Sequence, residues 1–250
     1  MKENLKFEFN KLIHSKIVIF IIIILLLPLI WGLILKIEPA WLVVEGKSDL
    51  FVYTLTMLQF VLLFKLHIIF FIFTYSSLGY EMSNGQLFYH LVRSPNRNLV
   101  FFTKYIFNLS VILMFISFFS LISFTSYNLF IKGSKFGISK ITWWETNQRE
   151  IVIQIIFLLC YLVFLITLTF FISVFIKSIN SIFIVILIDI VLGLLVKIED
   201  IKFYIPNFIA LSNTIHDIEF EKLLINAIVI LVSTLLILLL TVVRFNKTNL

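Results

Sequence analysis

Residues 17–35, "IVIFIIIILLLPLIWGLIL", decide the fold, because this run carries no charge and is almost entirely apolar. A helix that crosses the hydrocarbon core of a bilayer needs roughly 20 such residues. Lys16 and Lys36 bracket the run and mark its ends. The apolar core of a signal peptide is shorter, about 7–15 residues, and precedes a small-residue cleavage site. We therefore expect residues 17–35 to be a retained membrane-spanning helix.

The rest of the chain has the same character. It is 61% hydrophobic and 14% charged over 250 residues, with a mean hydropathy of +1.09, whereas soluble domains are about 25% charged. Lipid cannot satisfy the open backbone groups of a sheet edge, so the spans must be helical. The sequence predicts an all-α polytopic membrane protein whose residues 17–250 form one domain of six transmembrane helices. The five further spans are expected at residues 50–78, 105–131, 151–176, 178–196 and 223–243.

The second of these runs, residues 50–78, is longer than a bilayer requires. As one straight helix it would rise about 40 Å, against roughly 30 Å for the hydrocarbon core. We expect it to tilt or to project from the membrane.

Residues 1–16 precede the first span and show helical periodicity. Their apolar side chains recur at helical spacing, while Lys2, Lys6 and Lys11 lie elsewhere. The apolar positions are Leu5, Phe9, Leu12 and Ile13. This pattern predicts a short helix on the membrane interface. A charged flank to the first span is the alternative, since Phe7 interrupts the stripe.

The distribution of lysines predicts the orientation. The four lysines before the first span (Lys2, Lys6, Lys11 and Lys16) exceed the two after it, Lys36 and Lys47. Because Lys and Arg favour the cytoplasmic side and the first helix usually dominates, we expect a cytoplasmic N-terminus. With six spans, both termini then lie in the cytoplasm.

Several function classes lack support. The net charge of +6 comes from Lys and Arg at the ends of apolar runs, which argues against nucleic-acid binding. The sequence contains no zinc-protease motif, no serine-protease motif and no phosphate loop. The single cysteine, Cys160, cannot form a disulfide within the chain. We expect no enzyme activity and no cofactor in this chain, so that any ATP would be bound by another subunit.

Two charged residues fall inside the predicted spans, Lys65 and Asp189. A charge at membrane depth costs several kcal/mol, so such residues are functional candidates. They could pair with one another or line a polar path for cargo. Alternatively, Asp189 bonds a neighbouring hydroxyl group and Lys65 extends to the interface.

Between the second and third spans the chain leaves the apolar pattern with "YEMSNGQLFYHLVRSPNR", residues 80–97. Leu87, Leu91 and Val92 can form one apolar helix face, and the aromatic side chains of Phe88 and Tyr89 add bulk. Pro95 is expected to end the helix, because the residue before a proline avoids helical geometry. The plainer alternative is an ordinary hairpin between two spans.

This loop resembles the first cytoplasmic loop of ABC-2 type permeases, the membrane subunits of one class of ABC transporters. The resemblance rests on an acidic residue, a glycine, a short helix, and then a proline, an arginine and a lysine. Here these are Glu81, Gly85, the run "QLFYHLV", the run "SPNR" with Ser94, Pro95 and Arg97, and Lys104. The outline of six spans with a long first inner loop fits the same family. Gln86 departs from it, because many members have threonine there.

The resemblance implies that residues 83–92 form a coupling helix that docks in a groove of a separate ATPase subunit. Glu81 and Arg97 would flank it and pair with charges on that partner. Two ATPase copies, which bind ATP and Mg²⁺, and a second permease would complete the complex. Small permeases of this kind resemble subunits of bacterial peptide exporters, namely bacteriocin and lantibiotic immunity transporters and exporters of amphipathic phenol-soluble modulins. The expected cargo is an amphipathic peptide, exported across the bacterial plasma membrane for toxin secretion or self-immunity.

Other functions stay open at this point. The chain could be a non-transporting membrane scaffold, or the substrate-binding subunit of an uptake system. A secondary transporter is less favoured, because the sequence has no internal repeat and no paired intramembrane carboxylates.

Overall fold

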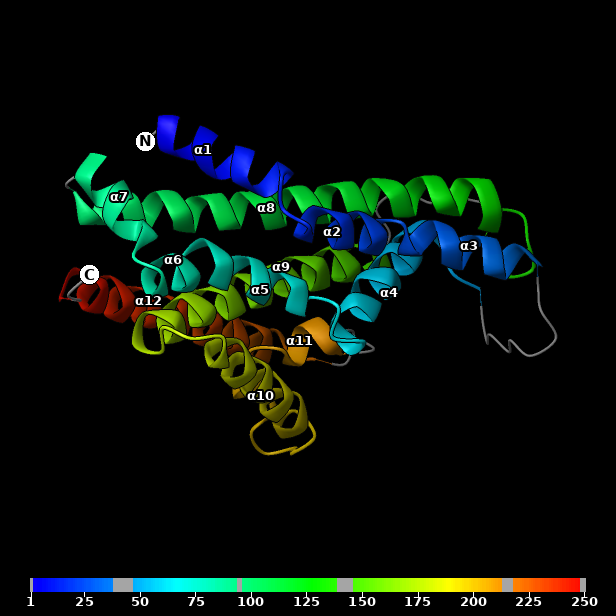
Figure 1. Cartoon of the computed structure of the whole chain (residues 1–250). Helices are drawn as coiled ribbons and strands as arrows, with labels where there is room; N and C mark the ends of the chain where they lie inside the picture. Colours follow the sequence, from blue (N-terminus) through cyan, green and yellow to red (C-terminus); the bar gives the residue numbers. More distant parts are fainter. Residues whose placement is uncertain (1, 38–46, 94–95, 139–145, 213–217, 248–250) are drawn as a thin grey trace.

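The computed structural model describes residues 2–37, 47–93, 96–138, 146–212 and 218–247. The regular secondary structure of this part of the chain is all helical, and it contains no strand, only one isolated bridge between Ser48 and Gly137. The prediction of an all-α fold is confirmed. Figure 1 shows an elongated bundle in which the longest helices run side by side.

Three long helices form the body of the bundle: α8 (Arg97–Ser126), α9 (Thr146–Phe175) and α12 (Phe220–Lys247). A π-helical turn, Tyr127–Ile131, extends α8. Together with residues 17–37, they are the four described helices that are long and apolar enough to cross a membrane. A bent pair raises this to five if it counts as one span. Such a set of apolar helices is the mark of a membrane protein.

The first predicted span comprises α2 (Ile17–Leu25) and α3 (Leu27–Ile37). It is fixed to the bundle at Pro28, whose carbonyl oxygen accepts hydrogen bonds from the hydroxyl groups of Tyr53 and Ser126, both at 2.6 Å. Gly32 permits this approach, because a Cβ atom there would lie 2.3 Å from the Ser126 Oγ.

The second predicted span is not one helix. It divides into α4 (Leu50–Leu63) and α5 (Ile68–Ser77). The segment Ile68–Ser83, which begins with α5, is bent by 64° from α4. The amide of Lys65 donates to the Leu62 carbonyl, and that of Leu66 donates to the Val61 carbonyl. This is the Schellman pattern that ends a helix, with Lys65 in the left-handed region at φ 57°. The prediction of a continuous helix over 50–78 is wrong at residues 64–67. The chain bends there instead of continuing as one tilted or projecting helix.

The fifth predicted span is α10 (Asn180–Leu195), which is apolar but only 16 residues long. It rises about 24 Å at 1.5 Å per residue. In Figure 1 it leans away from the long helices, and its tertiary contacts are mainly with α9 and α5.

The connection from α10 to α12 folds against the bundle through a short 3₁₀ helix, Lys202–Tyr204, and α11 (Phe208–Leu211). Three amide side chains donate to its backbone carbonyls, one each from α4, α9 and α12. Gln59 donates to Ala210 and Ser212, Gln154 to Ser212, and Asn226 to Phe203 and Ile205. The segment is therefore held by side chains of three separate helices.

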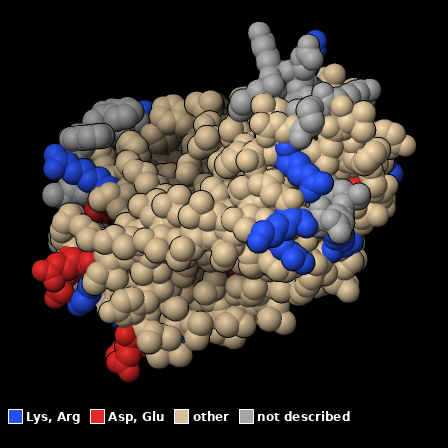
Figure 2. Space-filling model, turned by 90° about the vertical axis from the view of Figure 1, so that its left-hand side faces the viewer, with Lys and Arg blue, Asp and Glu red and all other residues tan. Residues whose placement is uncertain are grey.

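One end of the bundle, which we call the α7 end, carries α1 (Lys2–Ile13), α7 (Gln86–Arg93) and the C-terminal end of α12 (Figure 1). The amide of Asn246 near the chain end donates to Asn98 at the start of α8, at 2.7 Å. Figure 2 views this end and shows Lys and Arg side chains in several groups on it. Because both described termini lie at the same end, the chain crosses the bundle an even number of times.

Candidate functional site

The predicted coupling segment forms an elbow of two short helices, α6 (Gly79–Ser83) and α7. Gly85 lies between them at φ 70°, a conformation that glycine adopts without the steric penalty of a side chain. This turn makes the second helix begin at Gln86, whereas the sequence predicted a helix over 83–92. Ser94 and Pro95, which were expected to end it, lie outside the described residues.

The two faces of α7 differ from the expected ones. Leu87 is 0% exposed and belongs to the main core, against which Leu91 also packs. The exposed side chains are Phe88 at 55%, Tyr89 at 72% and Val92 at 66%. We call these three the elbow face. Leu87 and Leu91 therefore anchor the helix to its own bundle, and the assignment of these two residues to a docking surface is corrected.

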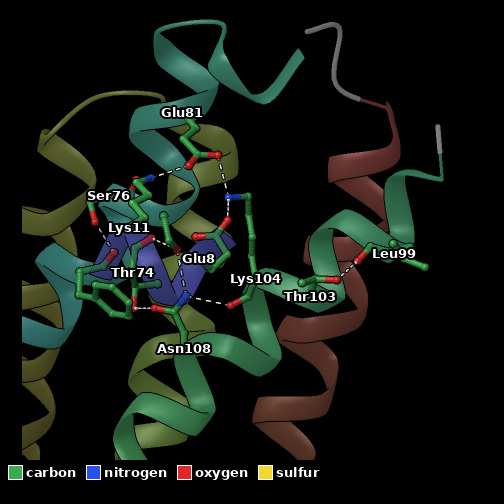
Figure 3. A network of polar contacts seen from close by, with 11 residues as sticks. Glu8, Lys11, Thr74, Ser76, Glu81, Leu99, Thr103, Lys104 and Asn108 are labelled. Carbon is green, nitrogen blue, oxygen red and sulfur yellow. Dashed lines mark hydrogen bonds and ion pairs between the residues drawn. The ribbon is translucent and has the colours of Figure 1, made fainter. Parts of the chain in front are cut away.

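An ion network fixes the elbow, formed by Glu8, Lys11, Glu81 and Lys104 (Figure 3). The Glu81 carboxylate lies 2.5 Å from the Lys11 ammonium and 2.7 Å from that of Lys104. Lys104 also bonds Glu8. We call this the elbow network. It joins α1, α6 and α8, and its two acids balance its two bases.

Three members of the elbow network are buried. The side chains of Glu8, Glu81 and Lys104 are each at most 3% exposed, and only Lys11 reaches the surface. Charges removed from water need partners that compensate their desolvation, so each of these side chains depends on the others. Glu81 is consequently unavailable to an ATPase subunit, and its expected pairing with a partner charge is corrected.

The face of α1 that contacts the bundle carries a charged residue between two apolar ones, and this places the charge in the elbow network. Leu5 and Leu12 pack against a small cluster containing Phe73 and Phe107, and Glu8 lies between them on the same face. Phe7, Phe9 and Ile13 are exposed. Of the predicted apolar stripe, Leu5 and Leu12 contact the bundle while Phe9 and Ile13 face outward.

Below the elbow network, Asn108 connects α5 and α8 (Figure 3). Its carbonyl oxygen accepts from the Thr74 hydroxyl at 3.0 Å, and its amide donates to the Ser77 hydroxyl and to the Lys104 carbonyl, both at 2.9 Å. Asn108 thereby connects α5 to the part of α8 that carries Lys104 of the elbow network.

Arg97, whose expected pairing with a charge on the partner stays a prediction, makes a contact within this chain. Its guanidinium donates to the backbone carbonyl of Asn246 at 3.0 Å. Arg97 thus joins the start of α8 to the end of α12, inside this chain.

A second polar cluster lies at the bend between α4 and α5. The structure brings Lys65 and Asp189 together, with 2.6 Å between the ammonium and carboxylate groups. His67 lies 3.2 Å from the same carboxylate oxygen, and the hydroxyl of Tyr161 donates to the other one. Asp189 thus bonds both a hydroxyl group and Lys65, two arrangements that the sequence analysis treated as alternatives.

Sequence reasoning missed four members of the two clusters. Lys11 is predicted only to lie off the apolar stripe of the interfacial helix, and Glu8 is not singled out, although Glu8 interrupts an apolar face at the i, i+3 spacing from Leu5. His67 is two residues from Lys65, which was a usable signal. Nothing in the sequence singled out Tyr161. In the described part of the chain, no three His, Cys, Asp or Glu side chains are placed to hold a metal ion.

Comparisons with known proteins find no family model, no curated protein and no solved structure that matches this chain.

Proposed function

We propose that this chain is the transmembrane subunit of an ATP-driven exporter of the ABC-2 permease type, with α7 as its coupling helix. The observation that carries the proposal is the elbow face. Phe88, Tyr89 and Val92 are 55–72% exposed on a helix at the bundle end, whose opposite face is buried in the core. A short helix that presents aromatic and aliphatic side chains suits docking in the groove of a partner protein.

The attachment of α7 gives the proposed coupling a physical route. Glu81 in the adjoining α6 contacts Lys11 and Lys104, so a force on the elbow acts on α1 and α8 together. Helix α5 connects the elbow to the bend at residues 64–67. ATP binding would bring two ATPase subunits together, and α7 would transmit that movement to the second and third spans.

The proposed topology has six spans, with the α4–α5 pair as one span and α10 as another. Both described termini lie at the α7 end, and this supports an even number of spans (Figure 1). Both termini would be cytoplasmic, in a bacterial plasma membrane. The complex would contain two ATPase subunits that bind ATP and Mg²⁺ and a second permease, identical or paralogous. The cargo would be an amphipathic or antimicrobial peptide.

Co-purification with the candidate ATPase subunit tests the proposal. We expect Phe88→Asp with Tyr89→Asp to reduce the retained ATPase at least about tenfold, since loss of two aromatic side chains that docking would bury exceeds the 1.4 kcal/mol that a tenfold change requires. Tyr204→Asp is the matched control, because Tyr204 is 56% exposed in the segment between α10 and α12. Full retention by the double variant would refute docking through α7 and favour a scaffold or another transport class.

Labelling of a single cysteine tests the orientation independently. In a Cys160→Ala background, Asn84→Cys places a thiol at the exposed elbow, and Asp200→Cys places one after α10. An impermeant maleimide is expected to label position 200 in intact cells, and position 84 only after the cells are opened. Labelling of position 84 from outside would place the elbow on the wrong side for a cytosolic ATPase.

A further inference from the structure

We infer that Asp189, Tyr161 and His67 form a binding site for a primary ammonium group, which the side chain of Lys65 fills in this structure. We call the three residues the ammonium site. They come from α10, α9 and the turn before α5, so the site is assembled from three separate elements.

The site is buried, and its side chains contact one another or the core. Asp189 and Tyr161 are each 1% exposed and His67 is 0% exposed. The His67 ring is held by an edge contact with the Phe71 ring, with 5.3 Å between centroids. Tyr161 bonds one carboxylate oxygen, and the Nε2 atom of His67 lies 3.2 Å from the other. The carboxylate is therefore oriented before any cation arrives.

Lys65 differs from these three residues, because its side chain is 34% exposed and belongs to the turn at the bend. The ammonium contacts the carboxylate oxygen that His67 also approaches. Of the four side chains in the cluster, Lys65 is thus the one that can leave without disturbing the core.

Lys65 occupies a backbone position that would suit glycine. This residue occupies the position after the helix C-cap, in the left-handed region that glycine adopts freely and other residues adopt at a cost. Non-glycine residues in that region persist where the surrounding structure fixes them, and they cluster at functional sites. The ion pair with Asp189 supplies that fixation here.

Charge balance determines what can replace Lys65. Departure of its ammonium would leave the buried Asp189 carboxylate with only the Tyr161 hydroxyl and the His67 ring as partners, which is unfavourable for a charge removed from water. Entry of another ammonium keeps the net charge of the site unchanged. A primary ammonium donates three hydrogen bonds, as lysine does, whereas a quaternary ammonium has no N–H group to donate. The site therefore exchanges one primary ammonium for another, and the exchange frees the turn between α4 and α5.

In an exporter of amphipathic peptides, the entering group would be a lysine side chain or the amino terminus of the cargo. That use rests on the proposed function, whereas the ammonium site itself does not. The experiment below uses the purified chain without an ATPase. A negative result there would contradict the ammonium site but not the docking of α7, and a failed co-purification test would contradict the docking of α7 but not the ammonium site.

The test is rescue of Lys65→Gly by n-butylammonium, whose four carbons match the lysine side chain. Glycine removes the ammonium and suits the left-handed backbone, so the variant keeps the bend. We expect its melting temperature to fall by roughly 5–10 °C, because the buried carboxylate loses its ammonium partner. Butylammonium chloride is expected to restore most of this loss in a saturable manner.

Three controls decide whether rescue occurs at the ammonium site. Tetramethylammonium and 1-butanol are expected to leave the melting temperature of Lys65→Gly unchanged. The double variant Lys65→Gly with Asp189→Asn is expected to show no response to butylammonium. Rescue by butanol, rescue that survives Asp189→Asn, or no rescue at all would overturn the inference.

A second variant covers failure of Lys65→Gly to fold. In a Cys160→Ala background, Lys65→Cys can be modified with a thiosulfonate that attaches an aminoethyl group, which rebuilds a lysine-like ammonium. The modified protein is expected to melt several degrees higher than protein carrying a neutral methylthio group. Equal melting temperatures would overturn the inference in the same way.

Discussion

Replacement of Lys104 by methionine is expected to lower the free energy of unfolding by about 3–5 kcal/mol, the usual cost of removing one partner of a buried ion pair. Lys104 is 1% exposed and is the base that contacts both Glu8 and Glu81. Methionine fills a similar volume, so lost packing contributes little. Its removal leaves two carboxylates for the one remaining lysine of the elbow network, Lys11. Thermal unfolding in detergent measures the loss.

Two further variants separate this charge effect from a general defect. Adding Glu8→Gln to Lys104→Met removes the surplus carboxylate and leaves Glu81 with Lys11, so part of the lost stability is expected to return. Lys222→Met is the surface control, since its pair with Glu219 at 3.1 Å is exposed. Exposed pairs contribute about 0–1 kcal/mol. If Lys104→Met behaved like Lys222→Met, the elbow network would not hold α6 in place.

The position of the elbow network bears on the proposed mechanism. A helix that only touched its bundle through Leu87 could slide when a partner pushed it. Glu81 prevents this, because its carboxylate contacts both α1 and α8 at distances of 2.5 and 2.7 Å. Helix α1, which the sequence predicts on the membrane interface, is tied to the elbow through Lys11 and Glu8.

The helical fold was predictable because long apolar runs have one stable backbone solution in lipid. Helix ends were less predictable. The sequence predicts that the third span begins at residue 105, directly after Lys104. In the structure α8 begins at Arg97, where the Asn96 side chain accepts from the Leu99 amide and caps the helix. A neutralised lysine can lie inside a helix, and hydropathy alone does not reveal its partner.

The sequence also did not predict which face of α7 is buried or where α4 and α5 bend, for a related reason. The run "QLFYHLV" is apolar on more than one side, so periodicity could not tell that Leu87 is buried and Phe88 exposed. The bend between α4 and α5 contains neither glycine nor proline, the usual signals. Lys65 at φ 57° takes the place of the expected glycine, and tertiary contacts with α10 decide its conformation.

The second large effect concerns the segment between α10 and α12, where Asn226→Leu is expected to cost about 2–4 kcal/mol. Asn226 is fully buried, and its amide donates to the carbonyls of Phe203 at 2.9 Å and Ile205 at 2.8 Å. Leucine has a similar size but no donor, so both carbonyls lose this bond, and a group left buried and unsatisfied costs about 1–3 kcal/mol. The contact to the Phe203 carbonyl is only partly buried, so the loss there is smaller than at Ile205.

The comparison variant is Asn128→Leu. Asn128 also donates an amide hydrogen bond to a carbonyl, that of Phe124 at 2.9 Å, but the contact is exposed and water can replace it. Its expected effect is therefore within about 0.5 kcal/mol. Limited proteolysis distinguishes local from global loss: Asn226→Leu is expected to speed cleavage within residues 202–212 before the bundle unfolds. Equal melting temperatures and equal cleavage rates for both variants would mean that Gln59 and Gln154 alone hold the segment against the bundle, because their donors to Ala210 and Ser212 remain.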